Sequence, residues 1–221
     1  GVLAILFTSA VKAPARDKSR ARTAMLGDIK SGLMYVVRSR MVLVLIILGL
    51  LTTLLAQPFR FIMPVFVVDV YGKGPESMGL LVAITGVGAL IGSLWIASIG
   101  KWHRGLLLLG SGLVSGVALL LIASIPVYFA AAGIMILLGL GDAGRQTLNQ
   151  AMIMEEVDDE YRGRVMSIFM MIWGMMPLGV LPAGLLAEAV SGQFAVGVMA
   201  TLLILVTFVL WATQKQLRNR M

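Results

Sequence analysis

Cysteine is absent from this 221-residue sequence, which excludes disulfide bonds, zinc sites with cysteine ligands and thiol nucleophiles. Histidine occurs once, at His103, so neither a multi-histidine metal site nor a Ser-His-Asp triad is expected. Charge is also scarce, since 13% of the residues are charged and 59% are hydrophobic, against about 25% charged in a typical soluble domain. This composition is typical of membrane proteins.

Apolar runs of about 20 residues alternate with short polar breaks, and a helix of that length crosses a hydrocarbon core of about 30 Å. The runs lack the alternating pattern of barrel strands, and only helices or closed barrels satisfy the backbone in lipid. The predicted fold class is therefore all-α, a polytopic membrane helix bundle. Its six expected transmembrane helices are residues 41–68, 78–99, 106–124, 127–150, 163–188 and 193–213.

The net charge of +7 is divided among the connecting loops. A nucleic-acid partner is not expected, because binding phosphates requires a basic face on one side. Loops rich in Lys and Arg alternate with loops that are not, and cationic loops face the cytoplasm. Both ends of the six-helix unit are therefore predicted to be cytoplasmic, and the lipid bilayer is its expected surrounding.

Four regions are predicted along the chain. Residues 1–10 resemble the end of a preceding transmembrane helix, and residues 11–40 form a cytoplasmic linker with eight lysines and arginines. Residues 41–213 form the six-helix transmembrane unit, and residues 214–221 form a cytoplasmic tail. Within the linker, Leu26, Ile29, Leu33 and Val37 recur at helical spacing, which indicates an amphipathic helix at the membrane surface. Alternatively, these residues extend the next span.

Small residues four apart allow two helices to pack closely in lipid. Four glycines have this spacing, namely Gly88, Gly92, Gly112 and Gly116. The fifth span is interrupted by a group of glycines and prolines that are also candidates for helix packing, namely Gly174, Pro177, Gly179, Pro182 and Gly184. Broken helices are typical of transporters, where bending opens and closes a path, although a static kink explains the group equally well.

The segment GLGDAG at residues 139–144 matches the dinucleotide pattern G-x-G-x-x-G. That pattern indicates a nucleotide site only between a strand and a helix of a βαβ unit. Here it lies inside an expected transmembrane helix, so no nucleotide site is predicted.

Ionisable residues inside spans are costly and usually face a cavity or a partner. Arg60 lies near Gln57 in AQPFRF and either contacts substrate in a cavity or extends to the lipid headgroups. Asp142 and Arg145 are three residues apart, on one helix face within pairing reach. This pair is either a switch that breaks as the inner side opens or a static structural pair. Trp173, among several methionines, is a further candidate for substrate contact, although lipid-facing filler is an alternative role for such methionines.

Five acidic residues lie within six positions before the segment YRGR, at Glu155, Glu156, Asp158, Asp159 and Glu160. The stretch DDEYRGRVMSIFMMIWGMMPLGVLPAGLLAE at residues 158–188 resembles the loop between helices ten and eleven of the major facilitator superfamily and the helix that follows. The segments at residues 27–46 and 63–94 resemble the same family near its helices seven and eight. The resemblance is closest to the bacterial branch of enterobactin exporters and macrolide-efflux pumps, and RGRVMS is its most specific element.

This resemblance implies that the chain is the carboxyl-terminal half of a twelve-helix transporter, with an amino-terminal six-helix half as its partner. It also implies that the acidic cluster pairs with Arg162 and Arg164 to latch the inner gate. In the loop IGKWHRG the family often has an acidic residue where Lys101 stands, so the resemblance gives no support for a latch there.

The predicted function is secondary transport in a bacterial inner or plasma membrane, with export of a small amphipathic molecule by alternating access. An ion gradient, of protons by resemblance, would drive it, and no cofactor, metal or enzymatic activity is expected. An uptake carrier of the same fold is one alternative. A membrane anchor or a scaffold within a larger protein is the other.

Overall fold

The computed structural model describes residues 18–100 and 103–214, which form helices with no strand among them. The predicted all-α class is therefore confirmed. The predicted helix end at residues 1–10 and nearly all of the predicted tail at residues 214–221 lie outside the described residues. The helices are α2 (Lys18–Arg38), α3 (Arg40–Ala56), α4 (Pro58–Val65), the π-helix η1 (Phe66–Val70), α5 (Pro75–Ile99), α6 (Arg104–Ser124), α7 (Tyr128–Glu156), α8 (Asp159–Gly174), α9 (Pro177–Ala189) and α10 (Gly192–Thr213).

Five helical segments are long and apolar enough to cross a membrane, and each coincides with a predicted span. They are Arg40–Val70, Pro75–Ile99, Arg104–Ser124, Asp159–Ala189 and Gly192–Thr213. The remaining predicted span, the fourth, at residues 127–150, corresponds to α7, which is 29 residues long. Asp142 and Arg145 lie within α7 and lower its mean hydropathy.

Prolines divide two of the spans into shorter helices. Pro58 begins α4 directly after α3 ends at Ala56, because proline has no N–H to continue the hydrogen-bond ladder. Pro177 begins α9 in the same way, after a turn at Met175 and Met176. Pro182 is accommodated inside α9. The predicted interruption of the fifth span is therefore present, at its first proline.

Glycines allow close packing between specific helices. A Cβ atom at Gly88 would collide with the backbone of Ile136, and one at Gly92 would lie 2.8 Å from the carbonyl oxygen of Leu140, so α5 packs on α7 here. Gly112 and Gly116 of α6 instead pack against side chains of α10, since a Cβ there would lie 3.1 Å from Oγ1 of Thr207 and 2.6 Å from Cγ1 of Ile204, respectively. The glycines of GLGDAG lie within α7 against α5 and α6, which explains that segment by packing rather than by nucleotide binding.

The packing prediction for the fifth span holds only in part. A Cβ at Gly179 would collide with the backbone of Leu54 in α3, whereas at Gly174 and Gly184 it would meet no described atom within 4 Å. The prediction is therefore wrong for Gly174 and Gly184 within the described chain. The glycine and proline content of a segment predicts that its helix is interrupted. Which of its glycines face a neighbouring helix depends on the rotation of α8 and α9 about their axes.

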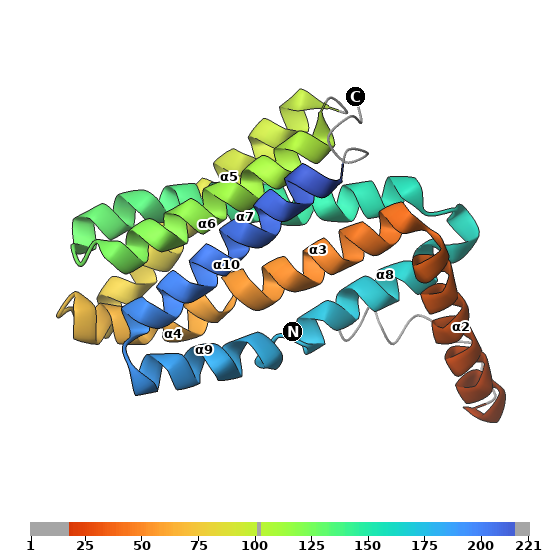
Figure 1. Cartoon of the computed structure of the whole chain (residues 1–221), viewed down its shortest axis with the longest axis horizontal. Helices are drawn as coiled ribbons and strands as arrows, with labels where there is room; N and C mark the ends of the chain where they lie inside the picture. The colour runs from red at the N-terminus through yellow and green to blue at the C-terminus, as the bar shows by residue number, and fades with distance from the viewer. Residues whose placement is uncertain (1–17, 101–102, 215–221) are drawn as a thin grey trace, which may run out of the picture.

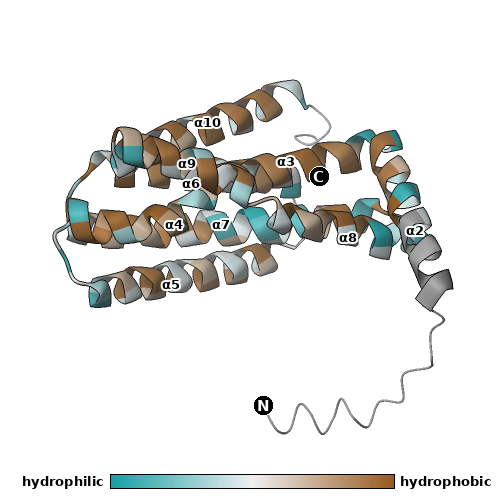
Figure 2. Cartoon of the chain, turned by 90° about the horizontal axis from the view of Figure 1, so that it is seen from below, coloured by the Kyte–Doolittle hydropathy of each residue, from teal (hydrophilic) through white to brown (hydrophobic). Residues whose placement is uncertain are grey.

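Figure 1 shows the spans running side by side, with α2 crossing their end beside α3 and α8. Hydrophobic residues run along the whole bundle in Figure 2, and hydrophilic residues gather toward its ends. α5 and the α8–α9 segment leave much of their apolar surface outside, including Leu90, Leu94, Leu181 and Leu185. Such surfaces require lipid or another helical protein to cover them.

The predicted amphipathic helix of the linker corresponds to α2. Ile29, Leu33 and Val37 are exposed, whereas Val36 on the other side is buried. The predicted apolar stripe therefore faces away from the bundle. It lies on a separate helix, because Ser39 interrupts the path between α2 and α3, and it does not extend the following span.

Candidate functional site

Asp142 and Arg145 form a buried ion pair in the middle of α7. The Nη2 atom of Arg145 lies 3.2 Å from Oδ1 of Asp142, and the two residues are 3% and 8% exposed, respectively. This confirms the predicted pairing. Burial makes the pair costly to break, because either charge alone would be left uncompensated in an apolar environment.

Two hydroxyl groups from other helices complete this network. Ser115 on α6 donates a hydrogen bond from its Oγ to Oδ1 of Asp142 at 3.1 Å. Nη1 of Arg145 donates to Oγ1 of Thr52 on α3 at 2.7 Å. The pair therefore links α3, α6 and α7, which the sequence did not predict because Ser115 and Thr52 carry no distinguishing pattern.

Three buried polar atoms, two on α7 and one at the junction of α3 and α4, have no hydrogen-bond partner among the described residues. They are Nε2 of Gln57, Nε of Arg145 and Oδ1 of Asn149. An unsatisfied buried polar group costs about 1–3 kcal/mol. Polar groups kept at that cost are common where a protein binds a ligand or changes conformation.

A cavity of about 620 Å³ lies beside the network, between α4, α5 and α7. Its wall is mostly apolar and includes three methionines, at Met63, Met78 and Met135. Methionine is flexible and polarizable, so it adapts to ligands of different shape. The methionines expected from the sequence are others, at residues 170–176, because a local cluster is visible in a sequence whereas methionines that converge from three helices are not.

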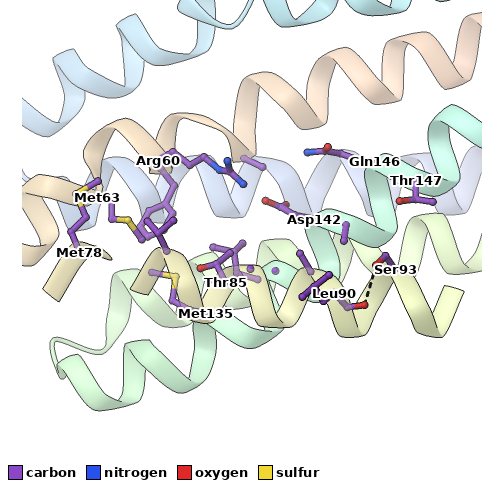
Figure 3. Close-up of a pocket in the computed structure, with 18 residues that line it drawn as sticks. Arg60, Met63, Met78, Thr85, Leu90, Ser93, Met135, Asp142, Gln146 and Thr147 are labelled. Carbon is purple, nitrogen blue, oxygen red and sulfur yellow. Dashed lines mark hydrogen bonds between the residues drawn. The ribbon is translucent and has the colours of Figure 1, made fainter. Parts of the chain in front are cut away.

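Polar groups enter this cavity from several sides, as Figure 3 shows. Arg60 of α4 and Asp142 of α7 both extend into it. The hydroxyls of Thr85 and Ser93 donate to carbonyl oxygens of their own helix, at 2.8 and 2.9 Å, so they present acceptor lone pairs to the cavity. Arg60 is thus placed as the cavity interpretation predicts.

A smaller cavity of about 240 Å³ lies between α3, α7 and α8. Trp173 and Met170 line it from α8, and Arg145 and Asn149 line it from α7. Gln146 lines both cavities. The three predicted substrate residues are therefore separated, with Arg60 at the larger cavity, Trp173 at the smaller one, and Gln57 buried at neither.

Ion pairs gather at the end of the bundle where α7 meets α8. Arg162 pairs with Asp159 at 2.6 Å, as the sequence predicted. Arg164 pairs with Asp28 of α2 at 3.0 Å, because α2 packs along α8 and brings its own carboxylate to this arginine. The pairing of Arg164 with the acidic cluster stays a prediction. Glu160 forms no ion pair with a described residue, whereas Glu156 has an interaction partner.

A further ion pair joins Arg104, at the start of α6, to Glu155, at the end of α7. The family resemblance gave no support for a latch at the loop before α6. Lys101, on which that expectation rested, lies outside the described residues. Arg104 lies close enough to Glu155 because α6 and α7 are antiparallel neighbours, which places the start of one beside the end of the other.

The bundle, its buried charges and its mostly apolar cavity agree with the result of comparing the sequence with known proteins. No curated protein matches the chain. The family model described as Major Facilitator Superfamily matches residues 1–180 and, in an overlapping second match, residues 45–219. Together these matches extend over nearly the whole sequence. The chain therefore belongs to the major facilitator superfamily and is a multi-pass membrane transporter.

Proposed function

We propose that this transporter exports a small amphipathic molecule, and that the cavity between α4, α5 and α7 holds the molecule during transport. The cavity carries the proposal. Its volume of about 620 Å³ falls within the range of about 300–1,000 Å³ for small-molecule sites. An apolar wall with a few polar groups suits an amphipathic molecule better than a fully polar one.

The ends of such a molecule would meet different groups. Arg60 offers a guanidinium and Asp142 a carboxylate in the same wall. Oδ1 of Asp142 is already engaged by Ser115 and Arg145, whereas its second oxygen accepts no hydrogen bond from a described residue. We assign substrate contact to Arg60 and to the second oxygen of Asp142, with Trp173 as a contact in the smaller cavity.

The arrangement of the whole transporter is part of the proposal. We propose that the chain forms the carboxyl-terminal half of a twelve-helix transporter from the enterobactin-exporter and macrolide-efflux branch, in a bacterial inner or plasma membrane. The sequence resemblance supports this, and the exposed apolar sides of α5 and α8–α9 offer surfaces for a second six-helix half. The two halves would rock about the cavity in alternating access.

Orientation and energy source follow from the same resemblance. We propose that the linker and the carboxyl terminus are cytoplasmic, in agreement with the Lys and Arg content of the loops. Export would be driven by exchange for protons. Asp142, a carboxylate in the cavity wall, is the described group best placed to contact a cationic substrate.

Flux through proteoliposomes tests this proposal. The full-length polypeptide is reconstituted, a pH gradient of either direction is imposed, and movement of a panel of macrolides, catecholate siderophores and amphipathic dyes is followed. Export requires that a compound moves against its gradient when protons move the opposite way. Movement in the same direction as protons would instead support the uptake carrier, and no flux of any compound would support a scaffold or anchor.

Two glycine variants connect the flux to the cavity. Gly86 lies in the cavity wall and Gly184 lies in α9 away from both cavities, and a Cβ at either position would meet no described atom within 4 Å. Gly86→Leu is expected to lower flux at least about tenfold by filling the cavity, whereas Gly184→Leu should leave it within about twofold. Equal flux in the two variants would exclude this cavity as the route.

A further inference from the structure

α2 is fixed to the bundle by specific polar and aromatic contacts in addition to the apolar packing of Val36. The hydroxyl of Tyr35 donates to Oδ2 of Asp158 and accepts from the backbone N–H of the same residue, both at 3.2 Å. The ring of Tyr35 stacks on that of Tyr161 with centroids 4.7 Å apart. Gly32 leaves room for Arg164, whose Cβ lies 3.0 Å from where a glycine Cβ would stand. These contacts hold α2 in one position on α8.

α2 lies at the end of the spans, where a bilayer crossed by these helices would place its headgroups. α2 ends at Arg38, and the first span begins two residues later at Arg40. In Figure 1 it crosses the end of the spans rather than continuing them. Its exposed side carries large apolar residues, namely Ile29, Leu33, Met34 and Val37, which are 38–61% exposed. An amphipathic helix of this kind lies in the interface with its apolar side among the acyl chains.

A cavity of about 370 Å³ opens where α2 meets the start of α3 and α8. It is lined by Ser31, Met34, Tyr35, Arg38, Ser39 and Tyr161. Arg38 is exposed and forms no ion pair with a described residue. The hydroxyl of Ser39 makes no capping bond to α3. The cavity thus combines an available guanidinium and an available hydroxyl with an apolar wall.

The neighbouring carboxylates are already engaged. Asp28 pairs with Arg164, and Asp158 holds the hydroxyl of Tyr35. Arg40 is exposed near the same end of the bundle and adds positive charge. The local field therefore favours an anion at Arg38, because the acids that could repel it are satisfied by other groups.

We propose that this cavity binds the headgroup of an anionic phospholipid. The phosphate oxygens would accept charge-assisted hydrogen bonds from the guanidinium of Arg38 and a hydrogen bond from Ser39. The acyl chains would lie against Met34 and the exposed apolar side of α2. Basic pockets beside transmembrane helices bind anionic headgroups for this reason. The apolar side of α2 favours a lipid over free phosphate, because free phosphate has no acyl chains to contact that side.

Lipid binding to the purified full-length protein tests this proposal. The protein is titrated in neutral detergent with phosphatidylglycerol or with phosphatidylcholine of the same chains, and bound lipid is counted by native mass spectrometry. Phosphatidylglycerol is expected to bind about tenfold more tightly. Arg38→Gln should weaken its binding about fivefold to tenfold, and Ser39→Ala about threefold.

Lys30→Gln is the matched control, since it removes the same charge from the same helix. Lys30 lies roughly 12 Å along α2 from Arg38, beyond a Debye length of about 8–10 Å. Its loss should therefore change phosphatidylglycerol binding less than about twofold. Unchanged circular dichroism in each variant establishes that α2 remains helical.

Four results would overturn the proposal. Equal binding of the two lipids would show that the cavity does not select an anionic headgroup. No lipid bound at all would show that the cavity is not a lipid site. Equal weakening by Arg38→Gln and Lys30→Gln would indicate diffuse attraction to the surface. Complete displacement of phosphatidylglycerol by millimolar inorganic phosphate would identify a free-phosphate site instead.

Discussion

Asp142 and Arg145 lie one turn apart on α7, and the 3.2 Å contact between Oδ1 and Nη2 is extended to α6 by Ser115 and to α3 by Thr52. A single pair therefore holds three spans in fixed register. Since both charges are buried, removing either one destabilises the protein mainly by leaving the other charge buried without a partner, and less by the loss of their attraction.

Replacing Asp142 with Asn is expected to lower the free energy of unfolding by about 3–5 kcal/mol, because Arg145 would remain buried without its counter-charge. Thermal unfolding of the purified protein measures this. The control is Asp159→Asn, which breaks an exposed pair and should change stability by less than about 1 kcal/mol. If the two residues stabilise the fold as a pair, the double reversal Asp142→Arg with Arg145→Asp should recover part of the free energy of unfolding that either single reversal loses. No recovery would contradict the pairing.

Replacing Arg60 with Gln is expected to lower flux at least about tenfold with little change in thermal stability, because its guanidinium is exposed to the cavity rather than buried among side chains. Lys73→Gln removes an exposed cation from the loop before α5 and should not change flux. Flux in proteoliposomes and unfolding temperature are measured on the same preparations. Normal flux in Arg60→Gln would assign this arginine to the headgroups instead.

Replacing Gly88 with Ala is expected to lower stability by about 1–3 kcal/mol, because the new Cβ would collide with the backbone of Ile136. Gly86→Ala, two residues away on α5, has open space. It should be neutral or stabilise by up to about 1 kcal/mol through higher helix propensity. Thermal unfolding of the two variants compares them directly, and similar melting temperatures would argue against the close approach of α5 to α7.

Replacing Tyr71 with Phe is expected to leave stability unchanged or to raise it slightly. The Tyr71 hydroxyl is buried without a hydrogen-bond partner among the described residues, and burial raises the pKa of Tyr71 to about 12. Tyr128→Phe should instead cost about 1 kcal/mol, because its hydroxyl donates to the carbonyl oxygen of Ser77 at 3.0 Å. The two rings are neighbours in a T-shaped contact, so the comparison isolates the hydroxyl. A larger loss in Tyr71→Phe than in Tyr128→Phe would contradict it.

The sequence by itself determined the local features of this protein. Span length depends on consecutive apolar residues, and the breaks at Pro58 and Pro177 depend on a missing N–H, so both can be predicted without tertiary contacts. The pairing of Asp142 with Arg145 is also local, since three residues along a helix bring two side chains together. The resemblance to the major facilitator superfamily rested on contiguous segments of sequence. The family match then confirmed membership of that superfamily.

Only the tertiary structure decided how the helices face one another. Lipid is as apolar as the helix surfaces, so hydrophobic periodicity does not reveal which side of a span is buried against a neighbour. The partners Ser115 and Thr52, the pairing of Arg164 with Asp28, and the convergence of Met63, Met78 and Met135 on one cavity all depend on that rotation. Close packing fixes the rotation of each helix, because a glycine such as Gly88 lets the backbone of a neighbouring helix approach, and a side chain at that position would keep the neighbour away.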